Sequence, residues 1–206
     1  VVNPRRNDSH YPDRNLSGAG VALKIAQGIF IRAEHVEWVP ALLKVAAIGT
    51  VADVVPLRGE NRVITSLGLD ALTAGVHTKG LQALLDVCGL TGQRIESDDV
   101  SYRLAPRINA AGRMKHGNHA VTLLTETDFN LAASYAVDID QFNTDRKETD
   151  RLITEEALLQ IEKNEEQDRF TTVVYDENWH KGVIGIVASR LTETYYRPTL
   201  VFTKSG

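Results

Sequence analysis

The sequence predicts an α/β fold in which helices predominate. Apolar residues recur at helical spacing through most of the chain, and residues 128–165 contain neither Gly nor Pro. Residues 171–202 then show a β-rich run, a helical pattern and a second β-rich run. This order and spacing are typical of the start of a parallel βαβ unit. The 206 residues, 43% of them hydrophobic, suit one or two globular domains.

The first half reads as a polar loop followed by helices. Residues 3–16 are rich in Asn, Asp, Arg and Pro, and Ser17 can cap the helix that follows. Apolar residues at helical spacing, with glycines as stops, predict helices over residues 18–33, 40–47, 61–74 and 80–87.

The stretch 128–165 predicts one continuous helix of roughly 55 Å, at about 1.5 Å per residue, which is long enough to connect two domains. Its charge-dense face, from Asp145 onward, is expected to be solvated and to carry i,i+4 ion pairs. Its apolar stripe consists of Ala132, Tyr135, Ile139, Phe142, Ile153, Ala157 and Ile161. Strands over 171–175 and 199–202, with a helix over 182–194 between them, are expected to follow.

One carboxylate, Asp53, stands inside the apolar run 46–57. A buried carboxylate without a partner loses its hydration at a high cost, so Asp53 is expected either to cap backbone N–H groups or to hold a cation. The run taken alone favours the cap, because Asp before an apolar turn that ends in Pro often caps a helix or closes a loop.

Two further segments carry groups that suit anions. In 102–114, Arg107 and Arg113 are planar donors for phosphate, Asn109 lies between them, and small residues permit close approach. Salt bridges from these arginines to Asp98 or Asp99 are the structural alternative. His180 and Lys181 directly precede the helix predicted over 182–194, so their donors and that helix N-terminus are expected to meet. A lone His is more often a structural residue, and that alternative stays open.

Composition limits the classes of function. A net charge of −4 gives no overall basic character, so a nucleic-acid partner must be met by a local patch and by metal ions that bridge to phosphate. The single cysteine, Cys88, excludes a disulfide framework and is expected to be buried. No membrane span or leader is found, which predicts a cytoplasmic protein. The chain lacks an initiator Met and stops after a β-rich run, so we expect it to be part of a longer protein.

Four motifs in order resemble the RecJ-type single-strand-specific exonucleases of the DHH phosphoesterase superfamily. They are residues 3–22 (Asn-Pro, Tyr-Pro and Leu-Ser-Gly-Ala-Gly-Val-Ala), 49–57 (Gly-Thr-Val-Ala-Asp-Val-Val-Pro-Leu), 107–113 (Arg-Ile-Asn-Ala-Ala-Gly-Arg) and 179–190 (Trp-His-Lys-Gly-Val-Ile-Gly-Ile-Val-Ala-Ser-Arg). The similarity spans nearly the whole chain.

The resemblance implies a domain organisation. Residues 1–57 would be the end of the DHH catalytic domain, 58–126 a helical region of the catalytic core, 127–165 the long connecting helix, and 166–206 the start of a DHH-associated domain. The chain contains no Asp-His-His triplet, which the family places just before residue 1. It also lacks the family's Gly-Ser-Gly-Arg-Ser-like loop, which would follow its last strand.

The resemblance also implies chemistry. Such an enzyme hydrolyses phosphodiester bonds of single-stranded DNA from the 5′ end, in repair and recombination, with two Mn²⁺ or Mg²⁺ ions. Asp53 would be a metal ligand and catalytic residue, and Arg107 and Asn109 would orient the scissile phosphate. The strand would be bound by Arg107, Arg113, His180, Lys181, Ser189 and Arg190.

Because most metal ligands would lie outside this chain, the chain alone is expected to be inactive. Its expected partner is single-stranded DNA, with a single-strand-binding protein and a helicase as candidate partners. A monomer without membrane contact is expected.

Two other classes of protein stay open. A small-substrate DHH phosphatase or oligoribonuclease would share the metal chemistry, although the long helix and the 107–113 motif favour enzymes that degrade polymers. A non-catalytic DHH-like scaffold that binds replication proteins would have lost metal carboxylates, and Asp53 argues against it.

Overall fold

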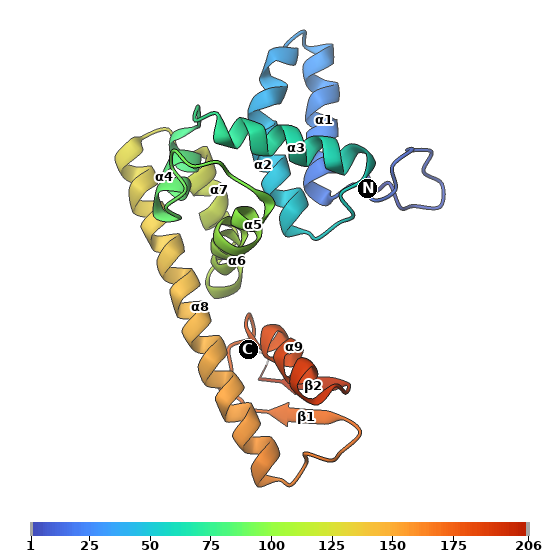
Figure 1. Ribbon diagram of the computed structural model, residues 1–206, viewed down its shortest axis with the longest axis vertical. Coiled ribbons are helices and arrows are strands. Elements are labelled where there is room, and N and C mark those ends of the chain that lie inside the picture. Colours follow the sequence, from blue (N-terminus) through green and yellow to red (C-terminus); the bar gives the residue numbers. More distant parts are fainter. Residues whose placement is uncertain (1, 205–206) are drawn as a thin grey trace. The chain divides into compact units, whose positions relative to one another are not determined.

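The structure of the protein is a computed structural model that describes residues 2–204, and it is mostly helical (Figure 1). The first half contains α1 (Gly18–Arg32), the 3-10 turn η1 (Val36–Trp38), α2 (Val39–Ala52), α3 (Gly59–Thr73) and α4 (Lys79–Val87). The second half contains α5 (Ser97–Asp99), the π-helical turn η2 (Val100–Leu104), α6 (Ala105–Met114), α7 (Asn118–Thr125), α8 (Phe129–Lys163), β1 (Thr172–Tyr175), α9 (Ile184–Tyr195) and β2 (Thr199–Phe202).

These elements confirm the helix-rich α/β fold. The continuous helix predicted over 128–165 is α8, and the predicted strands are β1 and β2. The second helix is longer than predicted, because α2 continues past residue 47 to Ala52. The sequence pattern does not predict α5, η2, α6 and α7. Residues 102–114, which form α6 and most of η2, suggest a ligand-binding motif without a helical pattern.

The chain folds as two compact units whose limits fall inside two helices. The first unit runs to Ile108 and includes Val121–Val137, and the second comprises Asn109–Ala120 and the chain from Asp138 onward. Both α6 and α8 therefore contribute residues to each unit. The domain limits expected at residues 57, 126 and 165 stay a prediction.

In the first unit, α2 packs against α1 on one side and α3 on another. The side chain of Ser17 caps α1 by accepting the Gly20 N–H at 2.9 Å, as predicted. Leu16, Leu23, Ala46 and Ile64 form the buried centre of this helix group. At Gly68 on α3, a Cβ atom would stand 2.6 Å from the carbonyl oxygen of Leu43 on α2. Only a residue without a side chain lets the two helices approach this closely.

In the second unit, β1 and β2 pair in parallel, with Thr172 opposite Thr199 and Tyr175 opposite Phe202. The connection through α9 is the predicted βαβ unit. The buried side of this small sheet meets α8 and α9 in a core formed by Ile153, Ala157, Ile161, Val174, Trp179, Val183, Val187 and Leu191. The side chain of Gln160 on α8 also exchanges two 3.0 Å hydrogen bonds with the backbone of Tyr175.

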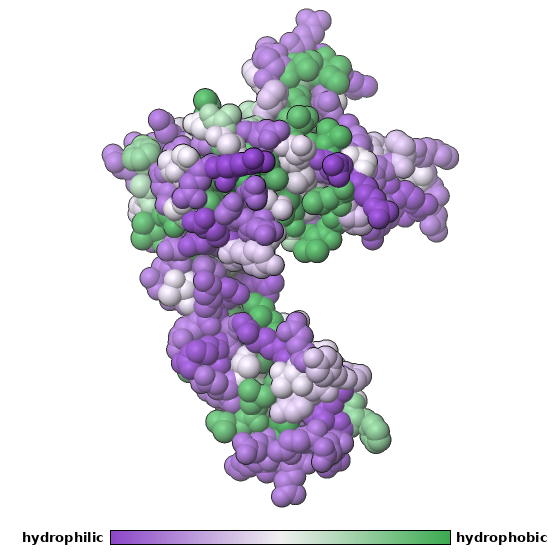
Figure 2. Space-filling model, in the orientation of Figure 1, coloured by the Kyte–Doolittle hydropathy of each residue, from purple (hydrophilic) through white to green (hydrophobic). Residues whose placement is uncertain are grey.

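Among the exposed apolar side chains of the described residues, two groups lie close together on one element or sheet. One is the second face of the sheet, where about half of each of four side chains is exposed: Val173, Tyr175, Leu200 and Phe202. The other is α1, where Ile25, Ile29 and Ile31 face solvent, and Figure 2 shows apolar surface in this region.

The outward surface over α8 is mainly hydrophilic (Figure 2). Arg151 pairs there with Glu148 at 2.7 Å and Glu155 at 2.6 Å, which confirms the predicted ion pairs on a solvated face. Among the helices of the described residues, none is both long and apolar enough to cross a membrane.

We expect Gly68→Ala to lower the free energy of unfolding by about 1–3 kcal/mol, because the new methyl group forces α2 and α3 apart. Gly28→Ala is the matched control: Gly28 also lies in a helix, but no atom stands within 4 Å of the position that its Cβ would take. That control should stabilise the protein by about 0.4–1 kcal/mol. Urea denaturation of both variants measures the difference, and equal effects would contradict the close approach.

Candidate functional site

Asp53 lies just past the last turn of α2, where its backbone N–H donates to the Gly49 carbonyl at 3.1 Å. The residue is exposed. The apolar run around it predicts burial, and that prediction is wrong: Ile48 and Val51 turn inward, while the end of the helix brings Asp53 to the surface. Within the described residues no hydrogen bond or ion pair is found for its carboxylate, so it does not act as a backbone cap either.

The residue after Asp53 has an unusual backbone. Val54 adopts φ = 53° and is 88% exposed. A β-branched residue rarely takes this left-handed conformation, and such strain persists only where the surroundings impose it. The strained turn directs the chain out of α2 and fixes the direction of residues 53–56.

Asn61 on α3 supplies the surrounding restraint. This residue is fully buried, and its amide nitrogen donates to the carbonyls of Asn15 at 2.7 Å and Pro56 at 3.2 Å. Its amide oxygen accepts the Ser17 N–H at 3.3 Å. One side chain therefore ties the N-terminal loop, the start of α1 and the segment after Asp53 to α3.

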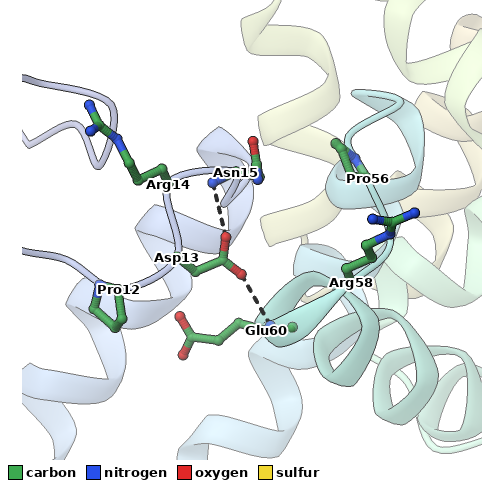
Figure 3. A pocket seen from close by; sticks show the side chains of 8 residues that line it. Pro12, Asp13, Arg14, Asn15, Pro56, Arg58 and Glu60 are labelled. Carbon is green, nitrogen blue, oxygen red and sulfur yellow. Dashed lines mark hydrogen bonds between the residues drawn. The ribbon is translucent and has the colours of Figure 1, made fainter.

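A hollow of about 360 Å³ opens beside Asp53 and is also lined by Arg5, Asn15 and Val55. A second hollow shares Asn15 and Pro56 with it and is lined further by Pro12, Asp13, Arg14, Arg58, Gly59 and Glu60 (Figure 3).

Asp13 organises the second hollow by accepting the backbone N–H groups of Asn15 at 2.9 Å and Glu60 at 3.2 Å. The side chains of Arg14 and Arg58 lie on opposite sides of it in Figure 3. Sequence reasoning missed these cations because it considered residues 3–16 as a loop and as part of a motif without assigning a role to Arg14, and because it did not single out Arg58. The signal was present in the recurrence of Arg within that loop.

Tyr11 and Lys24 hold Glu60 next to this loop. The Tyr11 hydroxyl donates to the Glu60 carboxylate, and Lys24 pairs with it at 2.7 Å. Burial, followed by the bond to Glu60, raises the pKa of Tyr11 to about 12. Burial alone would raise the pKa of Glu60, but the hydrogen bonds from Lys24 and Tyr11 bring it below its usual value.

The 107–113 motif forms most of α6. Arg107 is half-buried and donates to the Arg103 carbonyl at 2.8 Å, while Asn109 and Arg113 are exposed. Asn109 and Arg113 are four residues apart and share a helix face, whereas Arg107 points about 120° away from Arg113. The structure therefore does not bring the three predicted residues together on one face.

The small residues of this motif also differ from expectation. Ala110 and Ala111 were expected to leave room for a ligand, but both are fully buried and pack in the interior. Asp99, a candidate partner of Arg107 or Arg113, pairs instead with Arg103 at 3.2 Å. Cys88 is buried, as predicted.

His180 shapes the turn before α9. Its Nδ1 accepts the Gly182 N–H at 3.1 Å, and α9 begins at Ile184, two residues later than predicted. Lys181 is exposed, and Ser189 donates to the Gly185 carbonyl at 3.2 Å within the helix. In the motif 179–190, therefore, the charged group of Lys181 is exposed to solvent, whereas His180 and Ser189 form hydrogen bonds with neighbouring backbone groups.

Two motifs that are far apart in sequence meet in the second unit. Arg113 donates to the Gly182 carbonyl at 3.3 Å. A Cβ atom at Gly182 would clash with the Arg113 carbonyl oxygen, so glycine is required for this approach. Arg190, from the same motif as Gly182, forms a bidentate pair with Asp150 on α8.

This fold is shared with solved RecJ structures. RecJ of Thermus thermophilus in complex with Mg²⁺ superposes with a TM-score of 0.86 and 31% identity, over 98% of this chain and 31% of that chain. An exonuclease RecJ bound to manganese gives a TM-score of 0.85 and 31% identity, over 98% of this chain and 50% of that chain. The chain thus has the fold of a segment of a RecJ exonuclease.

Curated relatives agree with the structures, while no family model matches the chain. The single-stranded-DNA-specific exonuclease RecJ of Escherichia coli is 36% identical over an alignment of 220 positions, gaps included. This alignment covers 100% of this chain and 38% of that protein. The RecJ of Bacillus subtilis is 38% identical over 201 residues, 98% of this chain and 25% of that protein. The chain belongs to the RecJ family and spans less than half the length of these relatives.

Metal binding by this chain alone should be weak. Within residues 2–204, no group of three or more His, Cys, Asp or Glu side chains is placed to hold a metal ion. We therefore expect the 206-residue chain to bind Mn²⁺ with a dissociation constant of about 1 mM or above, and to leave single-stranded DNA undigested. Electron paramagnetic resonance of free Mn²⁺ during a titration measures the first quantity. Tight stoichiometric binding would contradict the expectation that most ligands lie elsewhere.

Proposed function

We propose that this chain is part of a metal-dependent exonuclease that degrades single-stranded DNA in the 5′-to-3′ direction during repair and recombination. The main support is the similarity to RecJ proteins along the whole chain, since those relatives are named for this substrate. The chain covers 38% or less of these two proteins, so the activity is proposed for the whole protein of which it is a part.

The proposed metal role rests on Asp53. Its carboxylate is exposed at the end of α2 beside a strained turn, and hard divalent cations prefer carboxylate oxygens. Two bound Mn²⁺ or Mg²⁺ ions would supply an activated water and stabilise the charge that develops on the phosphate. The residues present fit one ligand of such a centre, and the solved relatives contain Mg²⁺ and manganese.

The remaining proposed roles concern the substrate. Arg107 and Asn109 would orient the scissile phosphate. Arg107 would also bind the strand together with Arg113, His180, Lys181, Ser189 and Arg190. Planar guanidinium groups suit phosphate oxygens, and their contacts would be independent of base sequence. A single-strand-binding protein and a helicase are proposed as partners that deliver the strand.

Asp53→Ala in the full-length protein tests the proposed function. We expect it to nearly abolish Mn²⁺-dependent release of nucleotides from a labelled single strand, while the melting temperature stays within a few degrees of the parent. The control Asp70→Ala removes another exposed carboxylate, on α3, and should leave turnover unchanged. Normal turnover by a folded Asp53→Ala protein would show that this carboxylate is not a metal ligand.

The salt dependence of binding tests Arg107 and Arg113. With EDTA present to prevent hydrolysis, replacing either by Gln in the full-length protein should make the negative slope of log K against log salt shallower by roughly 0.7, the value for one single-strand phosphate contact. Arg94→Gln is the control, because this exposed arginine lies outside the proposed contacts. If these arginines are structural, the melting temperature should fall and the slope should not change.

A further inference from the structure

A group of charged residues in the second unit has more positive than negative charge. Asp150 on α8 is 2% exposed and pairs with Arg190 on α9. Arg146 lies one helical turn before Asp150 on the same face of α8. Arg113 extends from α6 to the Gly182 carbonyl. We call Arg113, Arg146 and Arg190 the arginine cluster.

Asp150 holds the Arg190 guanidinium in one orientation. Nε of Arg190 lies 3.1 Å from each carboxylate oxygen, and Nη2 lies 2.7 Å from Oδ2. The Asp150 side chain is almost fully buried, whereas that of Arg190 remains 56% exposed. The pair therefore uses one edge of the guanidinium and leaves Nη1 for a further acceptor.

Arg146 is incompletely satisfied. Its Nη2 donates to the buried Asn143 amide oxygen at 3.1 Å, but its Nε is buried and has no hydrogen-bond partner among the described residues. Burial lowers the pKa of Arg146, and the nearby charges of Arg113 and Arg190 lower it further, while Asp150 opposes the shift. Because burial and the two neighbouring arginines disfavour the charged guanidinium, an additional anion nearby would stabilise it.

A comparison on the same helix distinguishes this cluster from a structural ion pair. Arg151 is bound by two glutamates, so its charge is more than balanced. In the arginine cluster, three guanidinium groups face the buried charge of Asp150, and Glu193 adds a weaker negative influence on Arg190, so positive charge still exceeds negative charge. If these arginines served only the fold, each would be expected to have carboxylate partners that balance its charge, as Arg151 has. Unbalanced charge on partly buried side chains is costly.

We propose that the arginine cluster binds a backbone phosphate of single-stranded nucleic acid, with Arg146 as a contact residue and Asp150 as a positioning residue for Arg190. The proposal rests on the proposed function and adds to it a residue on the long helix that no motif indicated. The phosphate supplies the missing negative charge and an acceptor for the unused donors of the cluster.

Binding of a fluorescent oligothymidylate to the full-length protein in EDTA, over a series of salt concentrations, tests the proposal. Arg146→Gln should weaken binding about fivefold at about 0.1 M salt and make the negative slope of log K against log salt shallower by roughly 0.7. Arg151→Gln, which removes the same charge from the same helix, should change neither quantity. Equal behaviour of the two variants, or no binding by the unsubstituted full-length protein, would overturn the proposal.

Asp150→Asn separates positioning from general electrostatics. Removing a negative charge near a phosphate strengthens binding if charge alone matters, whereas loss of the Arg190 orientation weakens it. We expect weaker binding in protein whose circular dichroism remains native, and stronger binding would overturn the role of Asp150. If Asp150→Asn does not fold, Arg190→Lys replaces it as the test: a retained charge without the planar pair should also weaken binding, and unchanged binding would overturn the role.

These assays contain no active metal, so their outcome does not depend on hydrolysis. Failure of the Arg146 test with an active full-length enzyme would leave the proposed function intact. If Asp53→Ala is fully active and Arg146→Gln binds the strand more weakly, the proposed metal role of Asp53 is wrong and the proposed phosphate site stands.

Discussion

The buried stripe along α8 is a constraint on both units, because this helix contributes residues to each. It is apolar toward both ends of the helix, with Ala132, Ala136 and Ile139 before the middle and Ile153, Ala157 and Ile161 after it. In the middle it is polar, because Asn143 and Asp150 occupy buried positions there. Buried polar side chains must be satisfied, and Arg146 and Arg190 satisfy these two. The helix thus specifies where cations collect in the second unit.

Much of the fold could be predicted from local sequence. Absence of Gly and Pro over 128–165 was enough to predict α8, and β-branched runs were enough to predict β1 and β2. The segment that forms η2 and α6 could not be predicted, because Pro106, Asn109 and Gly112 all have low helix propensity. Its helix is stabilised by burial of Ala110 and Ala111, which only the tertiary structure supplies.

The candidate site was predictable in its residue types but not in its pairings. Asp53 stands out in its apolar run, yet its exposure depends on where α2 ends, and the helix continues to Ala52, past the predicted end at residue 47. The Asp150–Arg190 pair joins residues 40 positions apart. No periodicity within either segment could indicate it. The hydrogen bond from Arg113 to Gly182 joins residues that are even farther apart in sequence, by 69 positions.

The exposed face of the two-stranded sheet has a practical consequence. Val173, Tyr175, Leu200 and Phe202 form an apolar surface on adjacent strands, next to backbone groups at the edges of a very short sheet. Gln160 covers part of one edge through the backbone of Tyr175. Uncovered apolar strands are the usual starting points of aggregation. When the chain is handled by itself, these four side chains and the exposed isoleucines of α1 will favour self-association at high concentration.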